Sequence, residues 1–343
     1  MTKIAMYNVS PIEVPYIEDW AKKNDVEIKT TDQALTSATV DLAEGCSSVS
    51  LKPLGPVDEE VVYQKLSEYG VKCIGLRIVG FNTINFDWTK KYNLLVTNVP
   101  VYSPRAIAEM TVTQAMYLLR KIGEFRYRMD HDHDFTWPSN LISNEIYNLT
   151  VGLIGVGHIG SAVAEIFSAM GAKVIAYDVA YNPEFEPFLT YTDFDTVLKE
   201  ADIVSLHTPL FPSTENMIGE KQLKEMKKSA YLINCARGEL VDTGALIKAL
   251  QDGEIAGAGL DTLAGESSYF GHTGLTDSEI PEDYKTLAKM PNVVITPHSA
   301  FYTETSIRNM VQICLTDQLT IAKGGRPRSI VNLTASGHHH HHH

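Results

Sequence analysis

Apolar residues along this chain follow two patterns that alternate from one end to the other. Short continuous apolar runs predict buried strands, and longer segments with apolar positions three or four residues apart predict helices. This alternation favours an α/β fold with parallel sheets. In the first part of the chain the runs predict strands at 3–8, 26–30, 47–51, 72–77 and 94–98, with helices around 17–23, 40–45 and 59–69.

A second block of strands follows a long helix. Ser103 and Pro104 are typical of a helix start, and the apolar stripe of that helix continues through Leu119 and Ile122. The later strands are predicted at 151–154, 173–177, 203–206, 230–234, 256–261 and 293–296. A last helix at 307–322 is expected to pack back on the first block, because it needs an apolar surface to bury against. We therefore predict two doubly wound domains, a discontinuous one of residues 1–102 and 301–334 and another of residues 103–300.

Composition excludes several classes of protein. Hydrophobic residues make up 44% of the 343 positions, yet no apolar run approaches the roughly 18 residues that a membrane span needs. The formal net charge is -13 without a basic stripe, which argues against a nucleic-acid partner. The first residues lack the apolar segment of a signal peptide, so we expect a cytoplasmic protein. The four cysteines fit no zinc or CxxC spacing, and residues 337–343 are a histidine tag that we exclude from the fold and metal arguments.

A glycine pattern lies between the strand predicted at 151–154 and a following helix. Gly155, Gly157 and Gly160 match G-x-G-x-x-G. The first glycine allows a tight turn, the second lets the backbone approach a pyrophosphate, and the third lets helix and strand pack closely. The backbone N–H groups of His158 and Ile159 stand at the helix start, where the helix dipole favours phosphate. The pattern predicts a dinucleotide site, and the alternative is a packing turn without a ligand.

An acid in the expected place decides between the two nicotinamide cofactors. Asp178 ends the next predicted strand, within about 20 residues of the turn, where the motif has a carboxylate for the ribose hydroxyls. No Arg follows Asp178 to accept a 2′-phosphate, and its own charge would repel one. The sequence therefore predicts NAD rather than NADP.

Three polar side chains follow three successive predicted strands. Arg237 follows the strand at 230–234, Asp261 and Glu266 follow the next one, and His298 follows the last. Such strand ends converge at one edge of an open parallel sheet. Arg can polarise a carbonyl and pair with a carboxylate, and a His beside a carboxylate is a suitable acid-base group at neutral pH. Together with NAD, these residues indicate hydride transfer to a carbonyl.

The chain resembles the NAD-dependent D-isomer-specific 2-hydroxyacid dehydrogenases, and most of all the D-lactate and D-2-hydroxyisocaproate dehydrogenase branch of lactic acid bacteria. The likeness covers almost all of the untagged chain. It rests on the stretches "NVPVYSPRAIAE" (98–109), "VGLIGVGHIG" (151–160), "KVIAYD" (173–178), "DIVSLHTPL" (202–210), "MKKSAYLINCARGELVD" (226–242) and "MPNVVITPHSAFYTE" (290–304). It implies a flavodoxin-like substrate domain (1–102 and 301–334), a Rossmann NAD domain (103–300), a cleft between them, and a homodimer.

The resemblance also implies roles for single residues. Arg237 would bind and orient the 2-keto acid, His298 would donate the proton in its reduction, Glu266 would be the partner of His298, and Asp261 would sit by the nicotinamide. Substrate contacts would come from the backbone amides of Val79 and Gly80 and from Tyr102. The NAD site would be lined further by Thr208, Pro209, Thr214, Cys235 and Ala236.

Two segments depart from the family's D-lactate members. Residues 50–56 read "SLKPLGP", without the aromatic side chains that narrow the pocket, and residues 262–265 read "TLAG". Leu51, Leu54, Phe301 and Tyr302 are expected to form a roomier apolar pocket. We therefore expect a preference for branched or bulky substrates such as 2-ketoisocaproate. The alternative is a D-lactate dehydrogenase that acts mainly on pyruvate.

Rival functions stay open at the level of sequence. A protein of this fold that senses NAD and binds partners would keep the same residues, but this chain has no long disordered tail and no basic face. Enzymes of this fold that oxidise formate usually have Gln in place of Glu266, and those for 3-phosphoglycerate usually carry an extra domain. The segment "MDHDHDF" (129–135) suggests a metal site only superficially, and we expect a polar surface loop there and no metal.

Overall fold

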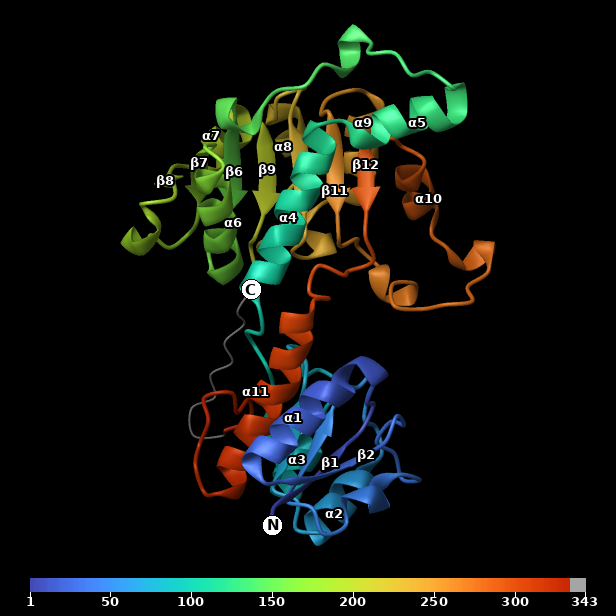
Figure 1. The fold of residues 1–343 in the computed structure, drawn as a ribbon, viewed down its shortest axis with the longest axis vertical. Helices are drawn as coiled ribbons and strands as arrows, with labels where there is room; N and C mark the ends of the chain where they lie inside the picture. The colour runs from blue at the N-terminus through green and yellow to red at the C-terminus, as the bar shows by residue number, and fades with distance from the viewer. Residues whose placement is uncertain (334–343) are drawn as a thin grey trace. The chain divides into compact units, whose positions relative to one another are not determined.

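The computed structural model describes residues 1–333 of the chain. The chain divides into two compact units (Figure 1). Among the described residues, the first unit comprises Met1–Ser103 and 303–333, and the second comprises Pro104–Tyr302. The domain bounds expected from the sequence, 1–102 with 301–334 and 103–300, stay a prediction. The tag at 337–343 lies outside the described residues.

The first unit is built on a five-stranded parallel sheet with the order β2-β1-β3-β4-β5. Its strands are β1 (Lys3–Met6), β2 (Glu27–Thr30), β3 (Ser48–Leu51), β4 (Cys73–Leu76) and β5 (Leu95–Thr97). Its helices are α1 (Val14–Asn24), α2 (Glu60–Glu68), α3 (Phe86–Lys91) and α11 (Glu304–Ala322).

Alternate residues of β1 face opposite sides of this sheet. Ile4 and Met6 pack with apolar residues of α1 and α11, whereas Ala5 and Tyr7 belong to the cluster that includes residues of α2 and α3. This period of two is what a strand buried on both faces requires. The helix α11 is thus part of the first unit, although it lies at the other end of the sequence.

The second unit is built on a seven-stranded parallel sheet with the order β12-β11-β10-β9-β6-β7-β8. Its strands are β6 (Thr150–Ile154), β7 (Lys173–Tyr177), β8 (Thr190–Tyr191), β9 (Ile203–Leu206), β10 (Tyr231–Asn234), β11 (Gly257–Leu260) and β12 (Val293–Ile295). Its helices are α4 (Pro104–Leu119), α5 (Ile122–Asp132), α6 (His158–Ala169), α7 (Phe194–Glu200), α8 (Glu220–Glu225), α9 (Thr243–Gln251) and α10 (Glu282–Ala288). Both sheets are parallel, and their strands alternate with helices along the chain, so the predicted fold class is confirmed.

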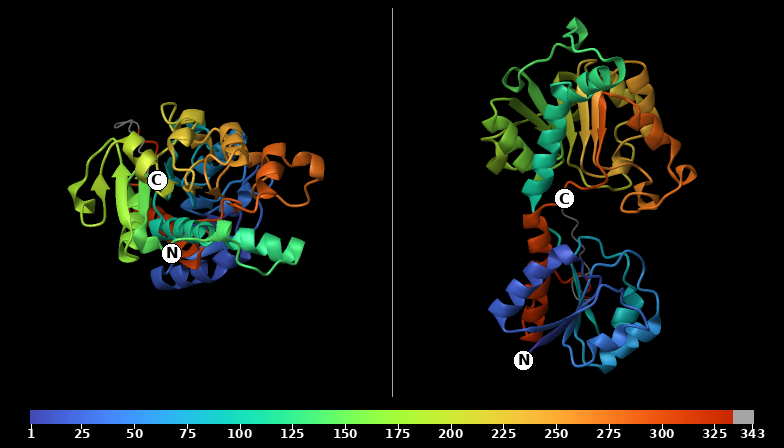
Figure 2. Two further views of the ribbon diagram at one scale, coloured as in Figure 1. Left: turned by 90° about the horizontal axis from the view of Figure 1, so that it is seen from above. Right: turned by 45° about the vertical axis from the view of Figure 1, so that its right-hand side comes forward.

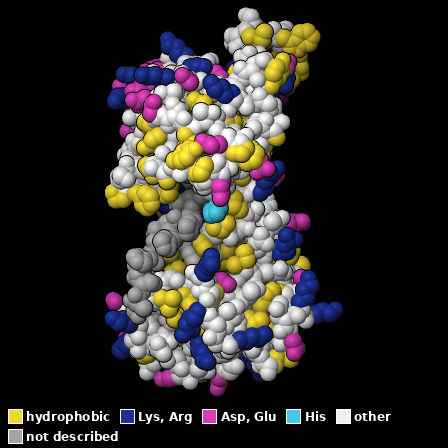
Figure 3. Space-filling model, turned by 90° about the vertical axis from the view of Figure 1, so that its left-hand side faces the viewer, with side chains coloured by type: hydrophobic (Ala, Val, Ile, Leu, Met, Phe, Trp, Pro, Cys, Tyr) yellow, Lys and Arg dark blue, Asp and Glu magenta, His cyan; other side chains and the backbone are white. Residues whose placement is uncertain are grey.

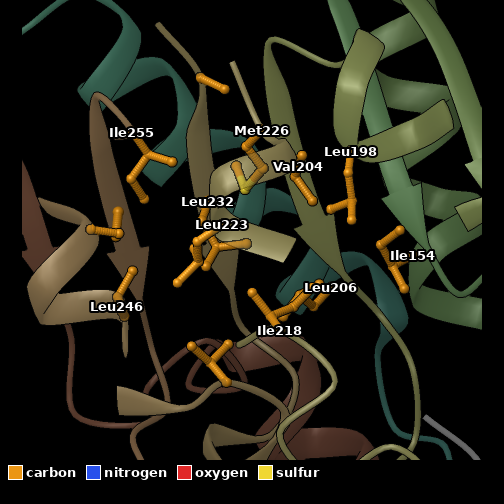
Figure 4. Packing of buried hydrophobic residues seen from close by; sticks show 14 of the residues in the cluster. Ile154, Leu198, Val204, Leu206, Ile218, Leu223, Met226, Leu232, Leu246 and Ile255 are labelled. Carbon is orange, nitrogen blue, oxygen red and sulfur yellow. The ribbon is translucent and has the colours of Figure 1, made fainter. Parts of the chain in front are cut away.

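Helices cover both faces of this second sheet, as parallel strands require. The helices α4 and α6 lie on one face, with α8 and α9 on the other (Figures 1 and 2). Figure 4 shows the core beneath α8 and α9, where Leu206, Ile218, Leu223 and Leu232 lie close together. Each unit therefore has its own apolar core.

Two local predictions were wrong, and one element was missed. The helix expected at 40–45 is a short 3-10 turn, Val40–Ala43. The long helix expected to continue through Ile122 ends at Leu119, because Lys121 takes a left-handed conformation with φ 57° and α5 starts after it. Lys121 Nζ donates a hydrogen bond of 2.9 Å to Tyr231 Oη, which stabilises the break. The two-residue edge strand β8 was not predicted.

The surface carries both signs of charge. Figure 3 shows lysine and arginine side chains interspersed with aspartate and glutamate on the face that it draws. Within residues 1–333, no helix has the length and apolar character of a membrane-spanning one. All four cysteines are buried and free.

Candidate active site

Loops with chemically useful side chains gather at one edge of the second sheet. The strand order places β6 between β7 and β9. The chain adds β7 and β8 on one side of β6 and then β9 on the other side, so the direction of the connections reverses at β6. Such a reversal opens a crevice at the carboxyl ends of the strands, which is where ligands bind in open parallel sheets. The glycine turn follows β6 at this point, and the loops after β9, β10, β11 and β12 lie along the same edge.

The glycine turn has the geometry of a phosphate site. Gly155 has φ 93°, a left-handed value that favours glycine. A Cβ on Gly155 would lie 2.7 Å from the backbone of His207, and one on Gly160 would lie 2.6 Å from Gly155 O. The helix α6 starts directly after Gly157, and the N–H groups of Ile159 and Gly160 have no acceptor among the described residues. The turn therefore offers donors and space for a pyrophosphate, so these residues fit NAD.

Asp178, directly after the neighbouring strand β7, accepts a hydrogen bond from the backbone of the glycine turn. One carboxylate oxygen accepts a hydrogen bond of 2.6 Å from the Val156 N–H, and the other accepts one of 2.8 Å from the Ala180 N–H. Carboxylate oxygens can each accept more than one hydrogen bond, so Asp178 keeps acceptor capacity for ribose hydroxyls. The same charge would repel a 2′-phosphate.

The other residues expected around NAD fall in the loops after β9 and β10. Thr208 Oγ1 donates to Ile154 O, and Thr214 Oγ1 donates to Pro209 O at 2.7 Å, so the loop after β9 is fixed by its own side chains. Ala236 N donates to Asn234 Oδ1 at 3.1 Å. The thiol of Cys235 is buried, and burial raises its pKa to about 12. Cys235 can thus present its backbone, rather than its side chain, at the sheet edge.

His298 and Glu266 form the central pair of the candidate site. His298 Nδ1 lies 2.5 Å from Glu266 Oε2, and Glu266 Oε1 accepts a hydrogen bond of 3.1 Å from Leu263 N–H. The hydrogen bond to Glu266 raises the pKa of His298 above its ordinary value, against an opposing effect of burial. Glu266 is therefore held by its own loop, and it favours the protonated imidazole.

Asp261 fixes the loop that carries His298. It is fully buried, and it accepts hydrogen bonds from the Ser299 N–H at 2.8 Å, the Ala300 N–H at 3.1 Å and Thr296 Oγ1 at 2.6 Å. His298 itself has φ 53° and donates its N–H to Asp261 O at 2.8 Å. Burial raises the pKa of Asp261, although these donors oppose the effect. The side chain thus sets the direction of His298 and is enclosed by protein.

Arg237 stands at the start of the loop after β10. Its side chain is exposed, and within the described residues its guanidinium makes no hydrogen bond or ion pair. The positive charge of Arg237 opposes protonation of the His298 imidazole and so acts to lower its pKa. Gly238 lets the loop of Arg237 approach the backbone ahead of Glu266, because a Cβ on Gly238 would lie 2.1 Å from the Leu263 carbonyl carbon. An unpaired Arg beside a His–Glu pair is suited to an anionic substrate.

A hollow of about 380 Å³ opens at the same place in the second unit. Its polar wall is made by Glu266 and His298, and its other walls are largely apolar or aromatic. The lining residues are Glu266, Phe270, Gly271, Pro297, His298, Ser299, Phe301 and Tyr302. Phe301 and Tyr302, which the sequence analysis expected to contact substrate, are among these lining residues, and so is Phe270, which it did not name.

The expected substrate residues of the first unit differ in exposure. Val79 is half-buried and Gly80 is exposed, in the loop after β4. Leu51 is 1% exposed and belongs to the core of the unit, so its side chain is not available to a ligand there. Leu54 is 97% exposed. Tyr102 O accepts a hydrogen bond of 2.6 Å from Asn309 Nδ2, which ties the segment before α4 to α11.

Sequence reasoning missed the buried polar residues behind the site. Gln114 Nε2 donates to Thr296 Oγ1 at 2.9 Å, and Thr296 in turn donates to Asp261. His207 lies beneath the glycine turn, where burial lowers its pKa to about 3, and its Nε2 is 2.8 Å from Ser205 Oγ. The one sequence signal for His207 is its position directly after the strand β9. His131 pairs with Asp132 on the surface, and the described residues contain no cluster of three or more potential metal ligands.

Comparison with known proteins places this site in a family. The family model described as D-isomer specific 2-hydroxyacid dehydrogenase, NAD binding domain, matches residues 112–300. A solved D-isomer specific 2-hydroxyacid dehydrogenase from Lactobacillus delbrueckii ssp. bulgaricus, in its NAD-complexed form, is 99% identical with a TM-score of 0.94 and covers 96% of this chain and 100% of its own. D-lactate dehydrogenase with NAD+ from Lactobacillus jensenii is 64% identical with a TM-score of 0.93, covering 97% and 100%. The D-lactate/D-glycerate dehydrogenase of Pediococcus acidilactici is 41% identical over 317 residues, 91% of this chain and 94% of the relative.

The fold, the glycine turn and these likenesses define an NAD-dependent oxidoreductase. More particularly, the chain belongs to the D-isomer specific 2-hydroxyacid dehydrogenase family.

Proposed function

We propose that this enzyme reduces 2-keto acids to D-2-hydroxy acids and prefers branched or bulky substrates such as 2-ketoisocaproate. The observation that carries the proposal is the His298–Glu266 pair, together with the hollow that it lines and with Arg237, whose guanidinium has no hydrogen-bond or ion-pair partner among residues 1–333. NADH, when bound at the glycine turn, supplies the hydride. The reverse direction oxidises the hydroxy acid with the same groups.

In this proposal His298 is the acid. Its Nε2 is the ring nitrogen that does not face Glu266, and it donates a proton to the carbonyl oxygen as negative charge develops there. Glu266 keeps the imidazole oriented and favours its protonated form. In hydroxy-acid oxidation the neutral imidazole accepts the proton instead.

Arg237 orients the substrate. Its guanidinium is a planar fork that can bind the 2-keto acid through carboxylate and carbonyl oxygens together. It also lowers the energy of the developing alkoxide, since it remains charged throughout. Val79 and Gly80 of the first unit are proposed to bind the substrate carboxylate through their backbone amides.

The aromatic wall of the hollow supports the substrate preference. Phe270, Phe301 and Tyr302 offer apolar surface to a branched side chain, and the hollow measures about 380 Å³. One methylene in such a site contributes only about 1–3 kcal/mol to binding of the transition state, so the preference for the larger substrate in kcat/KM would be moderate. The second candidate is a D-lactate dehydrogenase that acts mainly on pyruvate, which is favoured by the name of the Lactobacillus jensenii relative.

The test is NADH oxidation with pyruvate and 2-ketoisocaproate, with the chirality of each product determined. We expect D-hydroxy acid from both and the larger kcat/KM with 2-ketoisocaproate. A larger kcat/KM with pyruvate would favour the second candidate.

His298→Gln should lower kcat by about 10²–10⁴-fold while NADH binding persists, whereas Arg237→Lys should raise KM and lower kcat together.

We further propose that the protein is a cytoplasmic homodimer. The segment from α5 to β6 exposes Ile122, Tyr127, Phe135, Trp137 and Ile142, with Trp137 91% exposed. Exposed apolar side chains concentrated in one segment are typical of an interaction surface. A second copy is the proposed partner, and sedimentation equilibrium of Trp137→Ser against the unaltered protein tests it. An unchanged dimer would place the interface elsewhere, and a monomeric unaltered protein would refute the proposal.

A further inference from the structure

A glutamine of α4 packs against the strand that precedes Asp261. The side chain of Gln114 is 2% exposed. A Cβ on Gly259 of β11 would lie 2.9 Å from Gln114 Oε1 and 3.1 Å from Gln114 Cβ. The φ of Gly259 lies outside the left-handed range, so close packing, rather than backbone conformation, requires glycine at this position. A buried amide is costly unless its hydrogen bonds are made, so the partners of Gln114 indicate its role.

The hydrogen bonds of Gln114 run in one direction, towards Asp261. The Cys235 thiol lies 3.7 Å from Gln114 Oε1 and donates to it, since burial raises the pKa of this thiol to about 12 and keeps it protonated. Sulfur is only a weak acceptor, so this contact favours the amide orientation that turns Nε2 to Thr296. Gln114 Nε2 donates to Thr296 Oγ1 at 2.9 Å. The Thr296 hydroxyl has a single proton, which it donates to Asp261 Oδ1 at 2.6 Å.

Asp261 needs such donors because it is a buried carboxylate. Burial raises its pKa, and the hydrogen bonds from Thr296 Oγ1 and from the N–H groups of Ser299 and Ala300 oppose that effect. The ionised carboxylate accepts all three, whereas a protonated one has to place its own proton among these donors. Hydrogen bonds in a chain polarise one another, so the bond from Gln114 strengthens the one from Thr296.

We propose that Gln114 is a positioning residue for the proton transfer: by donating to Thr296 Oγ1, it directs the Thr296 hydroxyl proton to Asp261 and holds that carboxylate beneath the loop of His298. This inference rests on the proposed function, in which His298 is the proton donor. Gln114 is enclosed by protein and acts through Thr296, so it does not itself touch the substrate.

The charges around Asp261 come from the neighbouring loops. Among residues 1–333, the titratable groups that face it are His298 in the loop after β12, whose positive charge acts against the effect of burial on the pKa of Asp261, and the Cys235 thiol in the loop after β10. The hydrogen bond to Glu266 raises the pKa of His298, and the charge of Arg237 opposes this.

The helix α4 faces Asp261 with an uncharged side chain. Its charged residues, Arg105 and Glu109, form an exposed ion pair with each other. A neutral substitution of Gln114 therefore changes no charge in the site, and any change in the titration of Asp261 reports on its hydrogen bonds.

The experiment records kcat/KM for 2-ketoisocaproate against pH for Gln114→Met and Thr296→Val. Methionine fills a similar volume but cannot donate, and valine removes the Thr296 hydroxyl. Because a higher pKa of Asp261 means that its charge is lost at higher pH, the acidic limb should move to higher pH in both. We expect about one pH unit for Thr296→Val, which loses a hydrogen bond to a charged acceptor, and about half a unit for Gln114→Met. The alkaline limb should stay, because Asp261 is ionised there in every variant.

The double variant tests whether Gln114 acts through Thr296. Its acidic limb should match that of Thr296→Val alone, since two residues that act in series are not additive. Shifts that add would overturn the inference. Gln114→Asn is the second single variant, because it keeps an amide that is one methylene too short to reach Thr296 and should shift the limb as Gln114→Met does.

Gln318 provides a matched control in the first unit. It is also a buried helical glutamine: its Nε2 donates to Val49 O at 2.8 Å, and its Oε1 accepts from Cys314 Sγ at 3.4 Å. A Cβ on Gly75 would lie 2.8 Å from that oxygen. Gln318→Met should lower stability without moving either limb. A Gln114→Met profile that also keeps both limbs in place and only loses height would overturn the inference.

A second readout does not need turnover. In protein with ¹³C-labelled aspartate carboxyl groups, the Asp261 signal, identified by its absence in Asp261→Asn, should titrate at higher pH in Gln114→Met than in the unaltered protein. An unaltered protein that turns over no 2-keto acid, yet shows this difference, would refute the proposed function and leave the hold of Gln114 on Asp261 standing. An active enzyme whose Asp261 titrates alike with and without Gln114 would refute the positioning role alone.

Discussion

At the scale of single residues, the His298–Glu266 pair determines how activity depends on pH. The pKa of His298 is raised by its hydrogen bond to Glu266. Reduction needs the protonated imidazole, so kcat/KM for a 2-keto acid should fall as pH rises through that raised pKa. Glu266→Gln removes the charge of the partner, which should move the fall to lower pH and lower the activity most at alkaline pH.

The measurement is the pH profile of kcat/KM for reduction with saturating NADH. Glu282→Gln is the control, because Glu282 belongs to the same unit and forms an exposed ion pair with Lys285. Its profile should match that of the unaltered protein. A Glu266→Gln profile that only drops in height, without moving along the pH axis, would contradict this role for Glu266.

A second residue-scale prediction concerns the buried ion pair of the first unit. Arg77 Nε lies 2.9 Å from Glu13 Oε2, and both side chains are almost completely buried. Burial alone would raise the pKa of Glu13, but the charge and hydrogen bonds of Arg77 outweigh it and lower the pKa to about 2. Because the unfolded chain binds this proton more readily, the pair stabilises the fold fully above pH 4.5, and its contribution is lost as pH falls towards 2.

Glu13→Gln should therefore destabilise the protein by about 3 kcal/mol near neutral pH, since it leaves Arg77 buried without an opposite charge. Urea unfolding between pH 3.5 and 6.5, a range chosen around the ordinary carboxyl pKa of about 4.3, should show a flatter pH dependence for the variant. Glu27→Gln, which breaks an exposed pair with Lys3, should change stability by less than about 1 kcal/mol. Parallel pH dependences of Glu13→Gln and the unaltered protein would contradict the prediction.

At the scale of elements, close approach between loops holds the site together. Gly238 lets the loop after β10 touch the Leu263–Ala264 backbone ahead of Glu266. A Cβ on Gly238 would clash with main chain that cannot rotate away, so Gly238→Ala should destabilise the protein by about 1–3 kcal/mol. It should also lower kcat/KM by tenfold or more, an estimate of about 1.4 kcal/mol in transition-state stabilisation, because Arg237 and Glu266 move apart.

Gly244→Ala is the matched control for this element. Gly244 lies in α9, and a Cβ there meets only Asp242 Oδ1 at 3.6 Å, an ordinary contact. Alanine is favoured over glycine in a helix by up to about 1 kcal/mol, so this variant should be as stable as the parent or more so. Thermal unfolding and steady-state kinetics of both variants provide the comparison, and normal activity of Gly238→Ala would refute the argument.

The elements also show which features sequence can predict. Apolar runs such as Val151–Ile154 and Ile203–Leu206 predicted central strands, because a strand buried on both faces must be apolar throughout. Arg237, Glu266 and His298 could be proposed as site residues because they lie in the loops that follow such strands. The end of α4 could not be predicted, since Lys121 leaves the helix to reach Tyr231, 110 positions later. The hydrogen bond from Asn98 Nδ2 to Val79 O and the burial of Leu51 likewise depend on how strands pair in the sheet, which no local sequence pattern encodes.

At the scale of the whole molecule, the two units have separate sheets and separate apolar clusters. The residues expected to hold NAD lie in the second unit, and a ligand stabilises only the structure that binds it. NADH at one hundred times its Kd should therefore stabilise the second unit by about 2.7 kcal/mol. Hydrogen exchange of the central strands β6 and β9 should slow by about one hundredfold where exchange requires unfolding of that unit.

The core strands β1 and β3 of the first unit are the internal reference for this measurement, because NADH alone should leave their exchange nearly unchanged. Addition of a 2-keto acid together with NAD+ should then protect the amides of Val79 and Gly80, since the proposed carboxylate contact engages both N–H groups directly. Equal protection of both sheets by NADH alone would show that the units unfold as one. Protection of β1 and β3 without β6 and β9 would contradict the assignment of the cofactor to the glycine turn.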